Sequence, residues 1–133
     1  MARGRAPGYD TQREDILARA IACHQSWQFE DARSLYERIL ERDPVHADAH
    51  HNLGVLLAVQ LLQPLDALPH FEAALNQNAR SAQYWFSYID ALIRAKRSDL
   101  ARELLPVAHA QGLQTVMVNA LAERLQPLAE LPD

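Results

Sequence analysis

Three histidines stand close together near the middle of the chain, at His46, His50 and His51. Two histidines four residues apart can share one face of a helix and together hold a metal ion such as zinc. Pro44, however, places His46 at or before the start of the helix that follows, and no third ligand stands at a suitable spacing. We therefore expect no metal site.

The other residues that could perform catalysis either stand alone in the sequence or have a structural role in the expected helices. Cys23 is the only cysteine, so it can form no intramolecular disulfide and no CxxC pair. Glu30 and Asp31 stand where a helix is expected to begin, and carboxylates there complement the helix dipole. The sequence has no GxSxG, HExxH or glycine-rich phosphate motif. We predict that the protein is not an enzyme and binds no cofactor.

Composition and charge narrow the remaining functions. The chain has 133 residues, 49% of them hydrophobic, which suits one compact domain. Its net charge is −4, so the chain has no excess of basic residues to neutralise phosphates, and no nucleic-acid partner is expected. No run approaches the roughly 18 apolar residues of a membrane helix, and the N-terminus has no secretory signal pattern. We expect a cytoplasmic protein without membrane insertion.

Apolar residues recur every three or four positions along most of the chain, which is typical of amphipathic helices. The pattern predicts seven helices. The first begins near Thr11 or Asp15 and ends before Ser26, and the second carries a stripe from Ala32 to Leu40. The others span about 47–61, 65–76, 82–94, 99–110 and 114–125, with Ser98 as a cap and Gly112 ending the sixth. Residues 1–10 read as a disordered lead and 127–133 as a frayed tail.

The helices also repeat. Ala32, Ala67 and Ala101 stand at matching points, separated by two nearly equal intervals, and a bulky residue follows each of them at the fourth position. A period of about 34 residues is typical of helix hairpins that stack on one another.

This pattern resembles the tetratricopeptide repeat family, and more loosely the bacterial repeat modules that often accompany glycosyltransferase-type domains. The middle repeat matches the family's order with one extra residue in its turn, at His50, Leu53, Gly54, Leu57, Ala67, Phe71 and Ala74. The resemblance implies an all-α, right-handed superhelical stack of antiparallel helix hairpins, an α-solenoid of about seven helices. A single domain is expected over 11–126, with repeats at about 13–46, 47–81 and 82–113 and a capping helix at 114–125.

The resemblance also implies a function, because the first helices of such hairpins line a concave groove that takes a peptide or a partner helix. Carried over to this sequence, the partner-binding positions are Leu17, Ile21, His24, Asp48, His51, Asn52, Val55, Val59, Phe86, Ser87, Asp90 and Arg94. Asn52 is the sharpest candidate, since some family members bond the ligand backbone with an asparagine at that position. The expected partner is another protein or peptide.

Two alternatives stay open. The chain could be a self-assembly module, for example a homodimer formed through an exposed end of the stack. It could also be a substrate-recruiting fragment of a larger transferase, which the length of the native polypeptide would decide.

Overall fold

The computed structural model describes residues 9–126, with side chains described from Asp15 onward. Within that range the chain forms seven α-helices, one π-helical turn and no strand. The elements are α1 (Tyr9–Gln25), α2 (Phe29–Arg42), α3 (Ala47–Val55), η1 (Leu56–Gln60), α4 (Pro64–Gln77), α5 (Ala82–Arg94), α6 (Ser98–Ala110) and α7 (Thr115–Arg124). The all-α prediction is confirmed. Of the lead expected over residues 1–10, residues 9 and 10 belong to α1 and residues 1–8 lie outside the described residues, as does the tail expected over 127–133.

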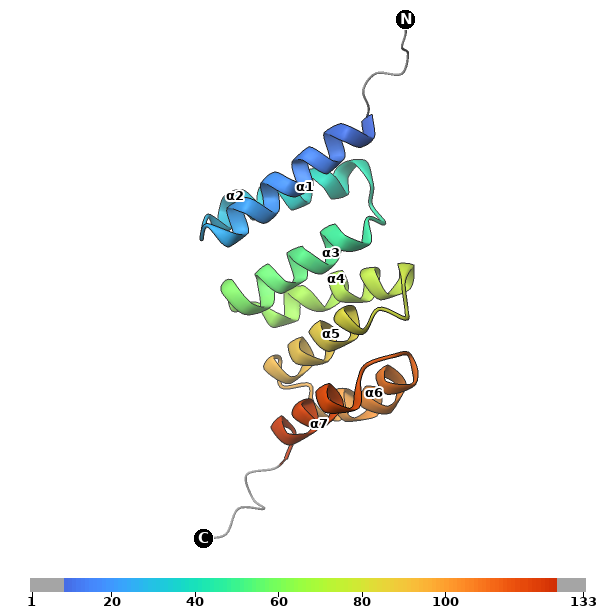
Figure 1. Ribbon diagram of the computed structural model, residues 1–133. Coiled ribbons are helices and arrows are strands. Elements are labelled where there is room, and N and C mark those ends of the chain that lie inside the picture. Colours follow the sequence, from blue (N-terminus) through green and yellow to red (C-terminus); the bar gives the residue numbers. More distant parts are fainter. Residues whose placement is uncertain (1–8, 127–133) are drawn as a thin grey trace, which may run out of the picture.

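The helices stack as hairpins along one direction (Figure 1). α1 packs against α2, α3 against α4 and α5 against α6, and α7 closes the stack against α5 and α6. Figure 1 shows the three turns inside the hairpins along one side and the connections between hairpins along the other. Such a stack brings the first helix of each hairpin next to the first helix of its neighbour.

Some helix ends differ from the predicted ones. α1 begins at Tyr9, two residues before the earliest predicted start. Ser98 is the first residue of α6 and makes no capping bond, so its predicted role as a cap is wrong. A serine does cap the preceding helix, α5: the Ser81 hydroxyl accepts a hydrogen bond of 3.2 Å from the Tyr84 amide. Gly112 lies just after the end of α6, as predicted, and has a φ of +125° that disfavours other residues.

The extra residue of the middle repeat lies in a helix and not in the turn. All three hairpins have three-residue turns, at 26–28, 61–63 and 95–97. The segment from α3 through η1 has nine plus five residues, whereas α5 has thirteen. The Leu61 amide reaches the Leu56 carbonyl at 3.0 Å, the i to i+5 spacing of a π-helix. A π turn absorbs one residue without shifting the helix that follows.

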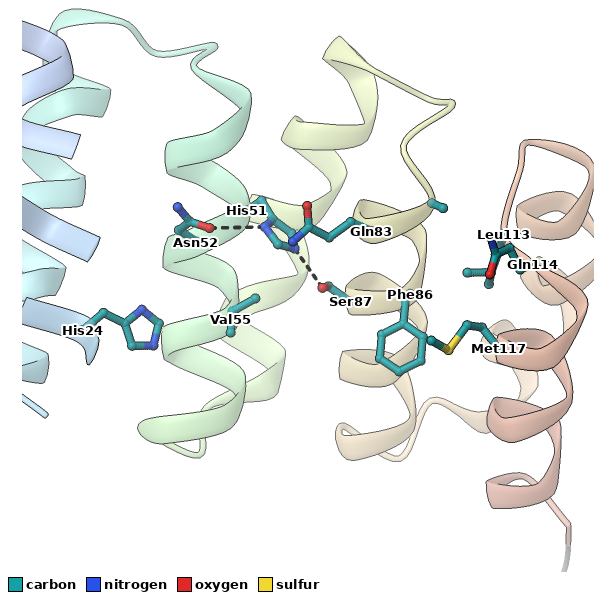
Figure 2. A pocket seen from close by; sticks show the side chains of 11 residues that line it. His24, His51, Asn52, Val55, Gln83, Phe86, Ser87, Leu113, Gln114 and Met117 are labelled. Carbon is teal, nitrogen blue, oxygen red and sulfur yellow. Dashed lines mark hydrogen bonds between the residues drawn. The ribbon is translucent and has the colours of Figure 1, made fainter. Parts of the chain in front are cut away.

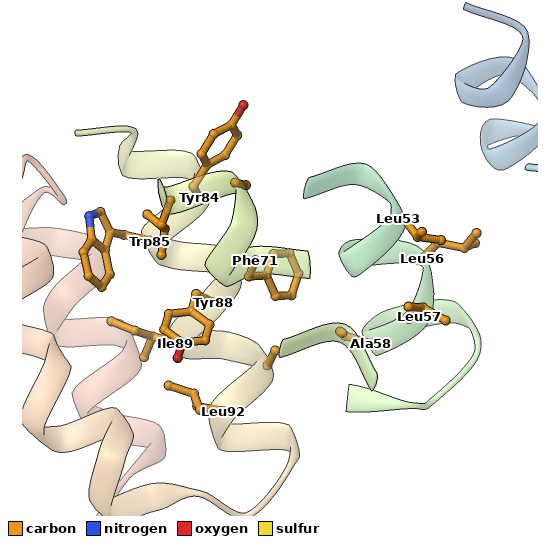
Figure 3. Close-up of a cluster of buried hydrophobic side chains, with 14 of the residues drawn as sticks. Leu53, Leu56, Leu57, Ala58, Phe71, Tyr84, Trp85, Tyr88, Ile89 and Leu92 are labelled. Carbon is orange, nitrogen blue, oxygen red and sulfur yellow. The ribbon is translucent and has the colours of Figure 1, made fainter. Parts of the chain in front are cut away.

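Small residues occupy buried positions in the stack. Ala20, Ala32, Ala67 and Ala101 have no exposed surface and belong to the buried hydrophobic cluster. Gly54 faces the ring of Phe71 so tightly that a Cβ there would lie 2.7 Å from a ring carbon. The buried cluster of the middle and third hairpins (Figure 3) holds α3, α4 and α5 in fixed positions, and α3 and α5 carry the candidate site.

Candidate functional site

A cavity of about 620 Å³ opens between α3, α5 and α7, and it is large enough for a sizeable side chain. Figure 2 shows side chains from these elements and from the end of α1 around it. Its lining consists of His24, His51, Asn52, Val55, Ala82, Gln83, Phe86, Ser87, Leu113, Gln114 and Met117. None of these residues carries a permanent charge, so the cavity suits an uncharged group.

His51 forms the polar back wall of the cavity. Its Nε2 lies 2.8 Å from the Ser87 hydroxyl and its Nδ1 lies 3.3 Å from the Asn52 side-chain oxygen. In this arrangement the Nδ1–H donates to Asn52, and Nε2 accepts from Ser87. The ring is 4% exposed and packs near Tyr84 and Phe71. Burial lowers the pKa of His51, although the bond to Asn52 and the charge of Asp48 oppose that shift.

His51 is one of the predicted partner-binding residues, and whether it contacts a partner stays a prediction. Its side chain lines the cavity but is almost fully buried, because it bridges α3 to α5. Its main contribution is to fix Asn52 and Ser87 in place. The oxygen of Asn52 accepts from His51, which leaves the two amide N–H groups of the half-buried Asn52 as donors toward a ligand.

Apolar side chains form the opposite wall. Val55 comes from α3, Phe86 from α5 and Met117 from α7, and Figure 2 shows the Phe86 ring and the Met117 thioether pointing toward each other. Met117 is 43% exposed, and methionine adapts its shape readily to an apolar guest.

A second hollow of about 420 Å³ continues from the first and shares Val55, Phe86 and Ser87 with it. Its far end is charged. Asp90 accepts from the Arg94 Nε at 2.9 Å and from the Arg124 Nη1 at 2.7 Å, so one carboxylate joins α5 to α7. The two hollows together form one groove, which we call the concave groove, with an uncharged part and a charged end.

The structure brings most of the predicted residues together. His24, His51, Asn52, Val55, Phe86 and Ser87 line the first cavity, and Val59, Asp90 and Arg94 line the second. His24 is held there by a contact of 2.8 Å between its Nε2 and the Gln60 side-chain oxygen. Which of these residues contacts a partner stays a prediction.

Three predicted residues lie outside both hollows. Leu17 and Ile21 are half-buried on α1 and line neither. Asp48 accepts a bond of 2.6 Å from the Tyr84 hydroxyl, so it braces α3 against α5. Burial and this bond raise the pKa of Tyr84 well above its usual value.

The predicted set lacks the residues that α7 and the segment just before it contribute. Leu113 and Gln114, which precede α7, and Met117 line the first cavity, and Arg124 lines the second. We expected this helix only to cap the stack. The repeat period could have indicated that this helix lines the groove. α5 begins at Ala82 and α7 at Thr115, one repeat period further along, so α7 occupies the place of the first helix of another hairpin.

The three histidines near the middle of the chain serve separate structural roles. His46 caps α3 by accepting from the Ala49 amide at 3.1 Å. His50 contacts the Pro44 carbonyl at 2.7 Å through Nε2 and His70 at 3.0 Å through Nδ1. No group of three or more His, Cys, Asp or Glu side chains in the described part of the chain is arranged to hold a metal ion. No helix in that part is both long and apolar enough to span a bilayer.

Comparison with known proteins identifies the fold. The sequence model of the tetratricopeptide repeat matches residues 25–61 and 55–111. Comparison with curated proteins gives no match. Among solved structures, the first tetratricopeptide domain of Spaghetti, bound to the HSP90 peptide SRMEEVD, has a TM-score of 0.78 at 13% identity, covering 90% of this chain and 95% of that one.

Two bacterial structures are similar as well. The Yersinia enterocolitica type III secretion chaperone SycD, in complex with a peptide of the translocator YopD, has a TM-score of 0.73 at 17% identity over 91% of each chain. PcrH in complex with the chaperone binding region of PopD has a TM-score of 0.72 at 20% identity, covering 94% of this chain and 91% of that one. Identities this low show a shared fold, and the repeat model covers more than half of the sequence, so this chain belongs to the tetratricopeptide repeat family.

Proposed function

We propose that this protein binds a partner protein by accepting a peptide or an amphipathic helix of that partner in the concave groove. The observation that carries the proposal is the groove itself, which α3, α5 and α7 build from residues far apart in the sequence. Apolar pockets with a few fixed polar groups are the usual form of a binding site.

The lining indicates what the bound segment presents. An apolar side chain fits between Phe86 and Met117, where it would be removed from water. The amide N–H groups of Asn52 suit a carbonyl of the bound segment, since the Asn52 oxygen is already engaged by His51. The uncharged lining disfavours a charged side chain at this point, because an isolated charge loses its hydration there.

Structures of similar fold support a peptide ligand. Three of them hold a peptide or a binding region of another protein: an HSP90 peptide, a peptide of YopD and the chaperone binding region of PopD. Proteins of this fold therefore bind segments of other proteins, and the groove of this chain is large enough for side chains of such a segment.

The test is a selection of peptides from a displayed random library on the wild-type protein, followed by affinity measurement on variants. Phe86→Ala with Met117→Ala removes the apolar wall, and we expect the affinity of selected peptides to fall at least about tenfold. Asn52→Ala removes the amide donors and tests the backbone contact separately. The matched control is Val116→Ala, an exposed apolar residue of α7 outside the groove.

Circular dichroism would first confirm that each variant is folded. Selected peptides that bind the double variant as tightly as the wild type would place the binding site elsewhere and contradict the proposal. Failure of the selection to enrich any peptide would contradict it too.

A further inference from the structure

The turns inside the three hairpins share an uncommon backbone conformation. Trp27, Leu62 and Lys96 have φ angles of 66°, 57° and 64°, and each stands at the same point of its own hairpin turn. The left-handed region brings Cβ close to the following carbonyl oxygen, so glycine or asparagine is usual there. The large side chains at these three positions therefore carry a conformational cost that glycine would avoid.

Two of the three turns present apolar surface. Trp27 is 81% exposed, Leu62 is 74% exposed and the nearby Leu65 is 52% exposed. Figure 1 shows the turns on one side of the stack, and we call that side, with residues 26–31, 61–66 and 95–100, the turn edge. Exposed apolar side chains gathered on one surface usually mark an interaction site.

Charge divides the turn edge into two unlike ends. The first turn carries the exposed carboxylates Glu30 and Asp31, and the second carries Asp66. No Lys or Arg occurs in the sequence between Arg42 and Arg80, which includes the whole second turn. The third turn carries the exposed cations Lys96 and Arg97 and one exposed carboxylate, Asp99, so its net charge is positive.

The cationic end is also hollowed. A depression of about 430 Å³ is lined by Lys96, Arg97, Ser98, Asp99 and Leu100. Cations beside an apolar side chain suit the face of an aromatic ring, because the ring quadrupole attracts the cation. Trp27, at the opposite end of the same edge, is the aromatic residue that the edge exposes most among the described residues.

We propose that a second copy of this chain docks antiparallel along the turn edge. The second turn lies between the other two along the stack (Figure 1). A twofold axis through it therefore sets the first turn of one copy against the third turn of the other. Trp27 then enters the partner's hollow, Glu30 and Asp31 face cations, and Leu62 meets its symmetry equivalent. A twofold interface of this kind uses the same surface on both copies and closes at two chains.

The charge pattern favours a second copy over other occupants. The two ends of the edge carry opposite charges, which a partner of a single charge sign would not match. Asp66, in the second turn, lies near its own symmetry equivalent and opposes the dimer, so the complementary contacts are those at the two ends. An anionic bilayer would be repelled by the three carboxylates beside Trp27 and Leu62, which are the residues that would have to insert.

Sedimentation equilibrium over a wide range of protein concentration tests the proposal. The wild type should show a reversible monomer–dimer equilibrium. Trp27→Gly and Leu62→Gly should each raise the dimer dissociation constant at least about tenfold. Glycine suits the left-handed conformation at both positions, so these variants should keep the monomer fold. Val45→Ser, at an exposed apolar residue in the connection between α2 and α3, is the matched control.

A charge exchange tests the antiparallel arrangement. Glu30→Lys with Asp31→Lys should weaken the dimer, and so should Lys96→Glu with Arg97→Glu, because each variant repels itself at both contacts. Mixed in equal amounts, the two should form a heterodimer close to wild-type affinity, since both contacts are then complementary.

Three results would overturn the proposal: a strictly monomeric wild type, glycine variants that dimerise as the wild type does, or a charge-exchanged mixture that stays monomeric. Flotation of a monomeric wild type with phosphatidylserine vesicles, lost in Trp27→Gly, would overturn it by assigning the edge to a membrane.

Discussion

The Ser87 hydroxyl lies 2.8 Å from the His51 Nε2 and so joins the first helices of two successive hairpins at the back of the concave groove. His51 comes from α3 and Ser87 from α5, 36 residues apart. Since the ring is 4% exposed, water replaces this bond poorly if it is lost. The contact therefore couples the shape of the groove to the stability of the stack.

Ser87→Ala should destabilise the protein by about 1–3 kcal/mol, because it leaves the buried Nε2 of His51 without its partner. Urea unfolding followed by circular dichroism measures the change. Ser34→Ala, at an exposed serine of α2, is the matched control and should change the free energy of unfolding by less than about 0.5 kcal/mol. Equal effects of the two substitutions would contradict a structural role for this bond.

Stability should fall in mild acid. Burial lowers the pKa of both His51 and His70 in the folded protein, and the neighbouring His50 adds to the shift of His70. Below a pH of about 6.5 the unfolded chain binds protons that the folded chain does not, so the free energy of unfolding falls as the pH falls. The contribution is fully present above the unfolded pKa and is lost as pH falls toward the lowered folded values.

Unfolding free energies between pH 8 and pH 5, roughly the window set by the unfolded histidine pKa, would check this. The variant His51→Leu is less stable overall, yet its stability should depend less steeply on pH. A pH dependence identical to that of the wild type would show that His51 does not resist protonation in the folded state.

Gly54→Ala should destabilise the protein even though alanine is the better helix former. A Cβ at this position would lie 2.7 Å from the Phe71 Cε1, so the ring must move within a packed core. Overpacking of this kind typically costs about 1–3 kcal/mol, which outweighs the gain of up to about 1 kcal/mol in helix propensity.

The companion variant Phe71→Leu removes the opposing ring. If Gly54 is small because of that ring, the two substitutions should be less destabilising together than the sum of their separate effects. Strict additivity in a double-mutant cycle would contradict the proposed contact.

The sequence contains enough information to predict the elements, because helix periodicity and the repeat of Ala32, Ala67 and Ala101 depend on local spacing. The fifth helix was predicted with its observed bounds. The π turn was not predictable in the same way. The one extra residue of the middle repeat is visible in the sequence, but its position depends on how Leu56 to Gln60 pack against neighbouring helices.

The candidate site was predicted in part for a similar reason. Family positions indicate which residues face the groove, and nine of the twelve predicted residues line one of its two hollows. Spacing does not show that the ring of His51 is buried between α3 and α5, because that depends on Ser87 and Tyr84 from another hairpin. The contribution of Met117 and Arg124 depends likewise on where α7 docks.

Docking of α7 should depend on apolar packing far more than on its ion pair. Leu121 is 1% exposed, and truncation of a buried leucine to alanine costs about 2–5 kcal/mol. Arg124 is 41% exposed where it pairs with Asp90, and surface pairs of this kind contribute about 0.2–1 kcal/mol. Asp90 also keeps its bond to Arg94 when Arg124 is removed.

The substitutions Leu121→Ala and Arg124→Ala should therefore have different effects on hydrogen exchange measured by mass spectrometry. α7 contacts only the neighbouring α5 and α6 among the elements with substantial contact, so Leu121→Ala should release it locally and leave the exchange of α3 and α4 unchanged. Arg124→Ala should leave the protection of α7 nearly intact. Because released α7 takes Met117 away from the groove, Leu121→Ala should also weaken groove ligands, although Leu121 lines neither hollow. Faster exchange across all helices would instead mean that the stack unfolds as one unit, and that α7 is an integral part of it and not a separable wall of the groove.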